Sequence, residues 1–291
     1  MSIAIIANPT AGRGRGERVT SQIMQYLSVK NIDVKIERTT YPQHAIALAK
    51  RAASEHETVV AIGGDGTIRE VLEGIGQTKA RLGIIPGGTG NDFARGLAIP
   101  RKPKEALDVV LAGYSRPLDV AVERDRIFGV SAAIGFPVTV IDHVNSHQDI
   151  LRGPVAIIAG VWRTLKNLQS HHVSLTIDGV RRELHTVAIL VMNMPYAGGG
   201  LMFAPTARYD DGLLSVLIVH PISRGDLAKT LPKIYRGEHI SHPKVELIQG
   251  KTICIEADNL QKMFDGDLYG STPLDVSIHP GAAKVIVSPD T

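Results

Sequence analysis

The stretch 59–70, Val-Val-Ala-Ile-Gly-Gly-Asp-Gly-Thr-Ile-Arg-Glu, places an apolar run directly before a glycine-rich turn and the start of a helical pattern. Glycines let a backbone approach a bulky anion closely, and the free N–H groups at a helix start favour negative charge. An aspartate in such a turn would repel phosphate unless a divalent cation lies between them. Asp65 therefore indicates a Mg-nucleotide site, and a tight turn with Asp65 as the N-cap of the helix is the structural alternative.

A second loop of the same kind follows at 82–95, Leu-Gly-Ile-Ile-Pro-Gly-Gly-Thr-Gly-Asn-Asp-Phe-Ala-Arg. Two such loops at the carboxyl ends of neighbouring parallel strands would face one crevice, which is where open α/β sheets bind ligands. A third glycine-rich loop, 8–16, follows the first predicted strand. It lacks the Gly-Lys-Ser/Thr ending of a P-loop, and its third glycine comes one residue too early for the dinucleotide fingerprint.

In combination these motifs resemble the diacylglycerol kinase and sphingosine kinase superfamily, and most of all its soluble bacterial lipid kinases. The resemblance covers nearly the whole chain, because it includes Thr39 ahead of His44-Ala45 and two later acidic motifs, 210–214 and 265–267. Gly-Gly-Asp-Gly-Thr alone also occurs in NAD kinases and phosphofructokinases. The chain departs from the family at Arg69, where Asn is usual, and at Asp267, where Glu is usual.

Composition limits the class of protein. The chain has 291 residues, 44% of them hydrophobic, and a formal net charge of +3. One cysteine excludes an internal disulfide and suits a reducing compartment. No signal peptide is visible, and the longest apolar stretch is far below the roughly 20 residues that span a bilayer. We expect a cytoplasmic protein that contacts a membrane peripherally and reversibly, with no nucleic-acid partner; a homodimer is compatible with the sequence, which does not determine oligomeric state.

The hydrophobic pattern predicts two domains. Residues 1–117 alternate strand and helix, which predicts a parallel α/β nucleotide-binding domain. Residues 118–291 are rich in strands and predict a β-rich lipid-binding domain, whose last residues could pack back on the first. The family implies a phosphofructokinase-like first domain, a β-sandwich second domain and an active cleft between them. In the second part, strands are expected at 118–123, 127–133, 173–177, 184–193, 213–220, 252–257, 274–279 and 284–287, and helices at 153–168 and 224–235.

The resemblance also implies an ATP site. Its residues come from the three glycine-rich loops, from the end of the second strand and from the helix after the Gly-Gly-Asp-Gly-Thr loop; Thr40 replaces Thr39 if the alignment shifts by one. The predicted ATP-binding residues are Asn8, Pro9, Gly12, Thr39, Gly63, Gly64, Asp65, Gly66, Thr67, Glu70, Thr89 and Asn91.

A magnesium site is implied as well. The resemblance points to the Asp211 carboxylate, the carbonyls of Arg208 and Leu213, and Asp92 through water. Few carboxylates and several waters suit Mg²⁺. From the residues alone, the segment 210–212 would be an ordinary turn and Asp92 a helix N-cap.

The family implies that the late Asp-Gly-Asp motif supplies the base that accepts the proton of the lipid hydroxyl. Position in the motif favours Asp267, with Asp265 as the alternative and Asp65 as the third catalytic candidate. By itself the motif would be a turn.

Together these observations predict an ATP- and Mg-dependent lipid kinase that acts on diacylglycerol and yields phosphatidic acid, as in phospholipid biosynthesis. A soluble-metabolite kinase of the NAD kinase type is one alternative, and a catalytically weak lipid- or nucleotide-sensing protein is another. The predicted helix 153–168 carries Trp162 beside Arg163 and Lys166. Tryptophan is typical of membrane interfaces, so this helix is a candidate docking element, and a helix with Trp162 in the core is the alternative.

Overall fold

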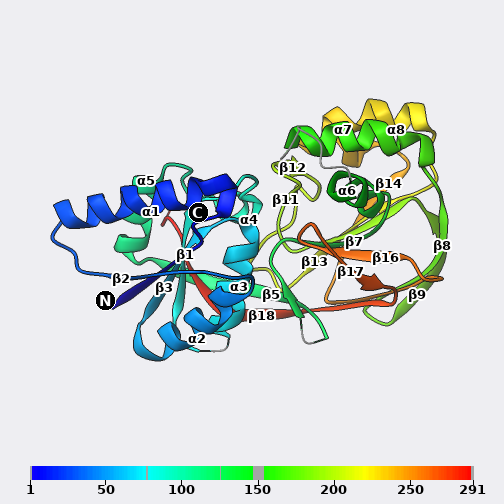
Figure 1. Ribbon diagram of the computed structural model, residues 1–291. Coiled ribbons are helices and arrows are strands. Elements are labelled where there is room, and N and C mark those ends of the chain that lie inside the picture. Colours follow the sequence, from blue (N-terminus) through cyan, green and yellow to red (C-terminus); the bar gives the residue numbers. More distant parts are fainter. Residues whose placement is uncertain (1, 77, 125, 147–153, 290–291) are drawn as a thin grey trace. The chain divides into compact units, whose positions relative to one another are not determined.

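The computed structural model describes residues 2–76, 78–124, 126–146 and 154–289 (Figure 1). The chain forms two compact units: Met1–Val120 with Pro280–Thr291, and Ala121–His279. Two strands, β5 (Ser115–Glu123) and β18 (Leu274–Ile286), contain residues of both units. Each unit has its own buried core.

The first unit is built on a parallel sheet. Its strands follow the order β2-β1-β3-β4, and the end of β18 adds to β4 in parallel through Val285 and Leu82. Buried apolar runs explain the central strands, since a parallel sheet is covered on both faces. The strands are β1 (Ile3–Ala7), β2 (Lys35–Arg38), β3 (Thr58–Gly63) and β4 (Arg81–Pro86).

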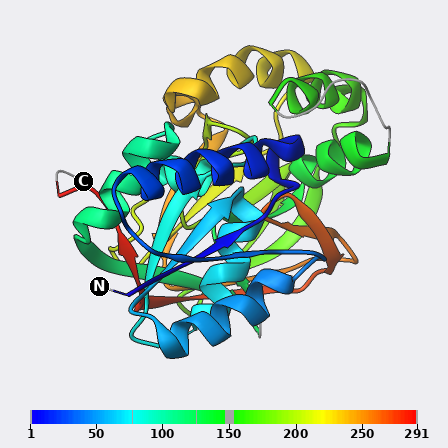
Figure 2. The ribbon, with the colours of Figure 1, turned by 60° about the vertical axis from the view of Figure 1, so that its left-hand side comes forward.

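Helices cover both faces of this sheet. Helix α1 (Ala11–Val29) and helix α5 (Pro103–Ala112) lie on one face, and α2 (His44–Glu55) and α3 (Asp65–Ile75) lie on the other (Figures 1 and 2). Short helix α4 (Asp92–Gly96) follows β4. Strands and helices that alternate along the chain produce this arrangement, so the predicted α/β architecture of the first part is confirmed.

The second unit contains two antiparallel sheet layers. One has the order β14-β13-β10-β7-β16-β17; in the other, β15 pairs with β8 and with the first part of β18, β8 pairs with β9, and β5 pairs with β6. Alternate residues of the strands form one core, among them Ile189 and Val191 of β10 and Ile253 and Ile255 of β15. This period-2 burial is that of a β-sandwich, which confirms the predicted fold class.

The strands of the second unit are β6 (Arg126–Phe128), β7 (Ser131–Gly135), β8 (His171–Ile177), β9 (Val180–Thr186), β10 (Ala188–Met192), β13 (Leu214–Val219), β14 (Val245–Gly250), β15 (Thr252–Glu256), β16 (Gln261–Phe264) and β17 (Asp267–Ser271), with a small hairpin of β11 (Tyr196–Ala197) and β12 (Leu201–Met202). Its helices are α6 (Phe136–Ser146), α7 (Pro154–Thr164) and α8 (Arg224–Thr230), with 3-10 turns η1 (Leu165–Asn167), η2 (Leu231–Arg236) and η3 (Glu238–Ser241). None of the helices in the described ranges is both long and apolar enough to cross a bilayer.

Several predicted elements of the second part are wrong in their bounds. The strand predicted over 184–193 is two strands in different sheets, because the chain changes sheets at Val187, whose N–H donates to the carbonyl of Val219. The strand predicted over 127–133 is likewise divided, with β6 ending at Phe128 and β7 beginning at Ser131. Conversely, 274–279 and 284–286 lie in the single strand β18, which ends one residue before the predicted end at 287.

Helices of the second part also differ from prediction. The helix expected over 224–235 ends at Thr230 and continues as a 3-10 turn, which contains Pro232. Helix α6 was not predicted, since its Phe-Pro-Val-Thr-Val-Ile start is rich in β-branched residues and resembles a strand. Residue 153 of the predicted helix 153–168 lies outside the described residues, and α7 with η1 covers 154–167.

Candidate active site

Three glycine-rich loops meet at the carboxyl edge of the parallel sheet in the first unit. A Cβ on Gly12 would lie 2.6 Å from the carbonyl oxygen of Gly87, and one on Gly88 would lie 2.4 Å from the Cα of Gly64. Such distances exclude any side chain larger than hydrogen. The loops after β1, β3 and β4 therefore pack backbone against backbone. Close packing of the loops is thus one reason for glycine at these positions, and the sequence alone does not distinguish it from the close approach of a ligand.

Gly66 differs from these packing glycines. It is exposed, and a Cβ built on it would meet no atom of the described chain within 4 Å. It lies in the first turn of α3, whose N-cap is Gly64 without a side-chain cap. The first N–H groups of an α-helix have no partner within the helix, and the space beside Gly66 is open, so this helix start has room for an anion.

Asn8 and Thr67 connect the first loop to the Gly-Gly-Asp-Gly-Thr loop. The Asn8 amide donates to the Thr67 hydroxyl at 3.0 Å, while its own Oδ1 accepts both the backbone N–H of Thr10 at 3.1 Å and the Thr10 hydroxyl at 2.9 Å. The carbonyl of Pro9 accepts the N–H of Glu17 at 3.3 Å. Gly12 has a left-handed φ of 55°, and the helical geometry of α1 begins only after this turn.

Asp65 joins the second and third loops. It is not the N-cap of its own helix; its carboxylate accepts the backbone N–H of Phe93 at 2.9 Å, at the start of α4. Burial raises the pKa of the Asp65 carboxyl above its ordinary value, and backbone N–H groups of 91–93 oppose that rise. The pair of loops is thus bound together by a half-buried acid whose charged form is costly in the folded chain.

The third loop is closed by its own side chains. Asn91, in a left-handed conformation with φ of 54°, exchanges two hydrogen bonds of 2.9 Å with the backbone of Gly88. Asp92 is buried and begins α4, with Asn91 rather than Asp92 as the cap, and its carboxylate lies 3.8 Å from Arg95 Nε. Thr89 is exposed at the tip of the loop.

Two further predicted residues lie after β2 and on α3. The N–H of Thr39 donates to the carbonyl of Ala7 at 2.9 Å, which places Thr39 beside the end of β1. Glu70 Oε1 accepts the N–H of Gln43 at 3.2 Å, so α3 is connected to the segment after β2. The predicted ATP-binding residues therefore lie at the end of β3, in the loops after β1, β2, β3 and β4, and in the first two turns of α3.

In the second unit, the Asp-Gly-Asp motif forms a two-residue hairpin turn between β16 and β17. Asp265 and Gly266 have φ of 50° and 91°, the type I′ signature for which Asp-Gly is a preferred pair. The Asp265 carboxylate accepts the N–H groups of Gly129, Val130 and Ser131, at 2.8, 2.8 and 3.0 Å. It therefore holds the connection between β6 and β7.

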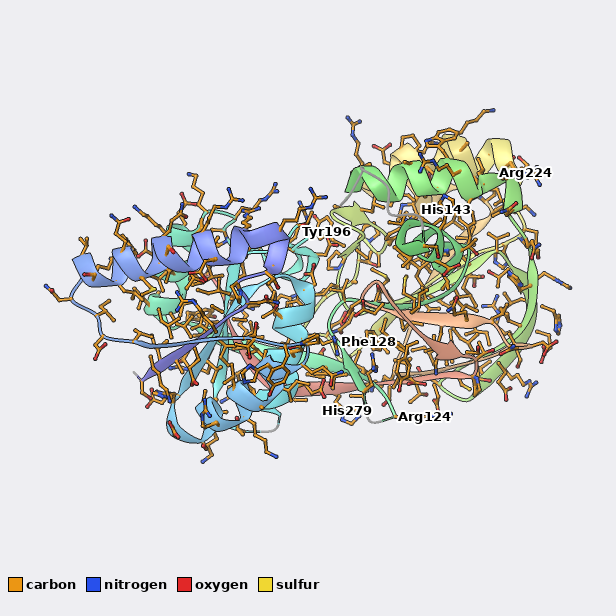
Figure 3. The ribbon with its side chains drawn as sticks, viewed as in Figure 1. Arg124, Phe128, His143, Tyr196, Arg224 and His279 are labelled. Carbon is orange, nitrogen blue, oxygen red and sulfur yellow. The ribbon has the colours of Figure 1, made fainter. Side chains whose placement is uncertain are left out.

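Asp267 has a different environment. It is exposed and begins β17, opposite Phe264. Phe264 packs against Phe128 with ring centroids 5.7 Å apart, so the turn that carries Asp267 rests on the sandwich core. Phe128 is labelled in Figure 3. A carboxylate that is exposed on a fixed strand end is available to a substrate, whereas Asp265 is engaged by backbone donors.

The second acidic motif also forms a turn in the second unit. Asp211 is exposed, and its Oδ1 accepts the N–H of Leu213 at 3.0 Å, while Arg208 Nε lies 3.3 Å from Asp210 Oδ1. The described part of the chain contains no cluster of three or more His, Cys, Asp or Glu side chains that could hold a metal. One carboxylate with neighbouring carbonyls is the set of hard oxygen donors that Mg²⁺ accepts, so the chemistry of the segment fits this ion.

Comparison with known proteins agrees with this description. A family model described as the diacylglycerol kinase catalytic domain matches residues 2–122, and one described as the YegS C-terminal NAD kinase beta sandwich-like domain matches residues 130–287. Diacylglycerol kinase of Mycobacterium tuberculosis (strain H37Rv) is 30% identical over 296 residues, with 98% of this chain and 94% of that protein covered. Diacylglycerol kinase of Bacillus subtilis (strain 168) is 30% identical over 275 residues, covering 92% and 90%.

Solved structures show the same fold. A crystal structure from Bacillus anthracis str. Sterne, of a protein assigned to the diacylglycerol kinases, superposes with a TM-score of 0.84 at 26% identity and covers 99% of this chain and 98% of that one. A parallel α/β unit with converging glycine loops and a β-sandwich unit with acidic turns define a two-domain kinase. More narrowly, the chain belongs to the diacylglycerol kinase family and is a lipid kinase by that membership, which also implies use of ATP.

Proposed function

We propose that this protein transfers the γ-phosphoryl group of Mg-ATP to the free hydroxyl of diacylglycerol, and that the product is phosphatidic acid. The observation that carries the proposal is the convergence of three glycine-rich loops on one sheet edge, with Gly66 open at the start of α3. The names of the curated relatives support diacylglycerol as acceptor. The same names favour a lipid over the soluble substrate of an NAD kinase.

In the proposed reaction, the lipid hydroxyl oxygen attacks the γ-phosphorus, the bond to the bridging oxygen breaks, and ADP leaves. The hydroxyl proton passes to the carboxylate of Asp267, which is exposed, and Asp265 acts by positioning the hairpin. Phosphoryl transfer needs charge neutralisation, in-line positioning and a proton acceptor more than covalent help.

Asp211 and the carbonyls of Arg208 and Leu213 are the residues that we propose hold Mg²⁺. When bound, this ion would neutralise charge on the phosphates. Asp211→Ala should lower turnover, and excess Mg²⁺ should restore part of it if only affinity for the ion is reduced. Turnover of Asp211→Ala that equals wild type at limiting Mg²⁺ would refute this assignment.

A direct test of the function compares phosphate acceptors. Purified protein with labelled ATP and Mg²⁺ is offered diacylglycerol in mixed micelles, a soluble alcohol, or NAD. We expect labelled phosphatidic acid from the micelles and no transfer to the other two. Transfer to NAD would support the soluble-metabolite kinase instead, and nucleotide binding without transfer to any acceptor would support a sensing protein.

We also propose that the protein docks reversibly on an anionic membrane through α7. Trp162, the single tryptophan, exposes 56% of its surface, which contradicts the core alternative, and Arg163 and Lys166 beside it are exposed. Each basic residue near an anionic leaflet contributes about 1 kcal/mol. Trp162 fluorescence should shift to the blue with anionic vesicles and lose this shift as salt shortens the Debye length to about 8 Å. A shift that is indifferent to lipid charge and salt would exclude electrostatic docking.

A further inference from the structure

The segment after β2 presents an aromatic pair at the surface of the first unit. Tyr41 exposes 60% of its surface, and its ring stacks on His44 with centroids 4.2 Å apart and planes inclined by 12°. His44 thus supports one face of the tyrosine ring while much of the side chain remains in contact with solvent. An exposed tyrosine in a fixed, flat stack is a surface on which another planar ring can lie.

Hydrogen bonds on both sides hold this pair in place. The backbone N–H of Thr40 donates to His44 Nδ1 at 3.2 Å, which fixes the orientation of the imidazole. The N–H of His44 donates to the carbonyl of Tyr41 at 3.3 Å, so the two stacked residues close one tight turn. Gln43, inside that turn, has a left-handed φ of 66°. The stack therefore belongs to an ordered turn.

The turn lies at the edge of the sheet where the glycine-rich loops converge. Thr39, immediately before it, is bound to Ala7 at the end of β1, and the N–H of Gln43 donates to Glu70 Oε1 of α3 at 3.2 Å. Glu70 follows Gly66 by four residues, which is about one helical turn. The aromatic pair is thereby connected to the helix whose start faces open space at Gly66.

We propose that Tyr41, supported by His44, is the stacking platform for the purine base of the nucleotide. This inference rests on the proposed nucleotide site, because it assigns the base to the segment after β2 when the phosphates bind at the start of α3. Exposed Thr40 and Gln43 flank the ring with hydroxyl and amide groups that can meet the polar edge of a base. Stacking of a base on an aromatic side chain contributes about 1–3 kcal/mol, and the larger ring system of a purine offers more contact than a pyrimidine.

The competing role for the stack is to stabilise the start of α2. That role predicts that loss of the ring lowers the melting temperature and weakens every ligand of the unit alike. A stacking platform predicts a loss confined to ligands that carry a base. Two probes separate the roles: ADP, which has a purine, and inorganic tripolyphosphate, which has phosphates alone.

The test measures binding of both probes in Mg²⁺ buffer by titration calorimetry, on the full chain and on Tyr41→Ala and Tyr41→Phe. Tyr114→Ala is the matched control, since Tyr114 is also exposed, at 42%. It lies far from the glycine-rich loops, because the carbonyl of the preceding Gly113 accepts from the side chain of Arg81, which is at the start of β4 and not at its carboxyl end. Thermal melts accompany each variant to detect a change in stability.

We expect Tyr41→Ala to bind ADP at least about fivefold more weakly, the lower end of base stacking at 1.4 kcal/mol per factor of ten. Its affinity for tripolyphosphate should be unchanged, Tyr41→Phe should bind like wild type, and the preference for ADP over CDP should shrink in Tyr41→Ala. An ADP affinity equal to wild type, or an equal loss for both probes, would overturn the platform alone. If wild-type protein binds neither probe, the proposed nucleotide site fails together with the platform.

Discussion

The two aspartates of the Asp265–Asp267 hairpin should respond to the same substitution in opposite ways. Asp265→Asn keeps the turn, because Asn also accepts a left-handed φ and Asn-Gly is as good a type I′ pair as Asp-Gly. It removes the charge and one of the two acceptor oxygens. The oxygen that accepts from Gly129 would become an amide that faces a backbone N–H, so two donors would oppose each other at a half-buried position.

The expected loss follows from the bonds in the structure. A hydrogen bond to a charged group contributes about 1.5–3 kcal/mol, and a buried donor left without a partner costs about 1–3 kcal/mol. Asp265→Asn should therefore destabilise the second unit by about 2–4 kcal/mol. For a unit of this size each kcal/mol lowers the melting temperature by about 2–4 °C, so a decrease of roughly 4–16 °C is expected.

Asp267→Asn should leave the melting temperature within the change typical of a surface substitution, about 0.5 kcal/mol, because Asp267 is exposed. Its turnover should fall by two orders of magnitude or more, the usual scale for a general base, with ADP affinity unchanged. Melts followed by circular dichroism and micelle turnover assays on both variants measure the contrast. A wild-type melting temperature for Asp265→Asn would refute the structural role of Asp265, and retained turnover in Asp267→Asn would refute Asp267 as the proton acceptor.

Three further predictions test single contacts. Because burial raises the pKa of Asp65, ionisation of this carboxyl costs stability in the folded chain. As pH rises from about 4 to 7, the wild-type melting temperature should therefore fall relative to that of Asp65→Asn. A difference in melting temperature between the two proteins that does not change with pH would contradict this. Gly88→Ala would bring a Cβ to 2.4 Å from the Gly64 Cα, so it should cost about 1–3 kcal/mol in denaturant unfolding and weaken ADP binding; wild-type stability would show that the loops can separate freely. Lys262→Ala should lower the free energy of unfolding by about 3–5 kcal/mol in denaturant titration, because it leaves the buried carboxylate of Glu123 without the ammonium that lies 2.6 Å from its Oε1. The double variant Lys262→Met with Glu123→Gln should recover most of that loss, and no recovery would contradict this reason.

Local patterns predicted what is decided locally. The apolar run 59–62 followed by glycines predicted β3, its turn and α3, because a buried parallel strand and a helix start each leave a distinct pattern within a few residues. The switch between sheets at Val187 could not be predicted. The apolar character of 184–193 continues across it, and only the pairing of β10 with β7 and β13 shows that the chain has entered the other sheet.

The candidate site was predicted as a set of loops, and its internal contacts were not. The sequence does not distinguish the roles of the glycines in these loops. Only the structure shows that Gly64 and Gly88 pack against each other, whereas Gly66 faces open space. Likewise Asp65 was assigned either to a metal or to its own helix, and its observed partner, the N–H of Phe93, is distant in sequence. Contacts of this kind depend on the register of neighbouring strands.

The four aspartates of the acidic motifs differ in exposure and in their hydrogen-bond partners, and this difference assigns them different roles. Asp65 and Asp265 each accept backbone N–H groups from a different loop, so each carboxylate maintains the shape of a turn that brings other groups into position. Asp211 and Asp267 are exposed, Asp211 in the turn before β13 and Asp267 at the start of β17. Because a proton acceptor or a metal ligand must meet a reactant from solvent, the exposed acids are the ones to which we assign chemistry. On this argument, substitution of the first pair should change stability together with activity. Substitution of the second pair should change activity much more than stability, although Asp211→Ala also removes the hydrogen bond from the Leu213 N–H.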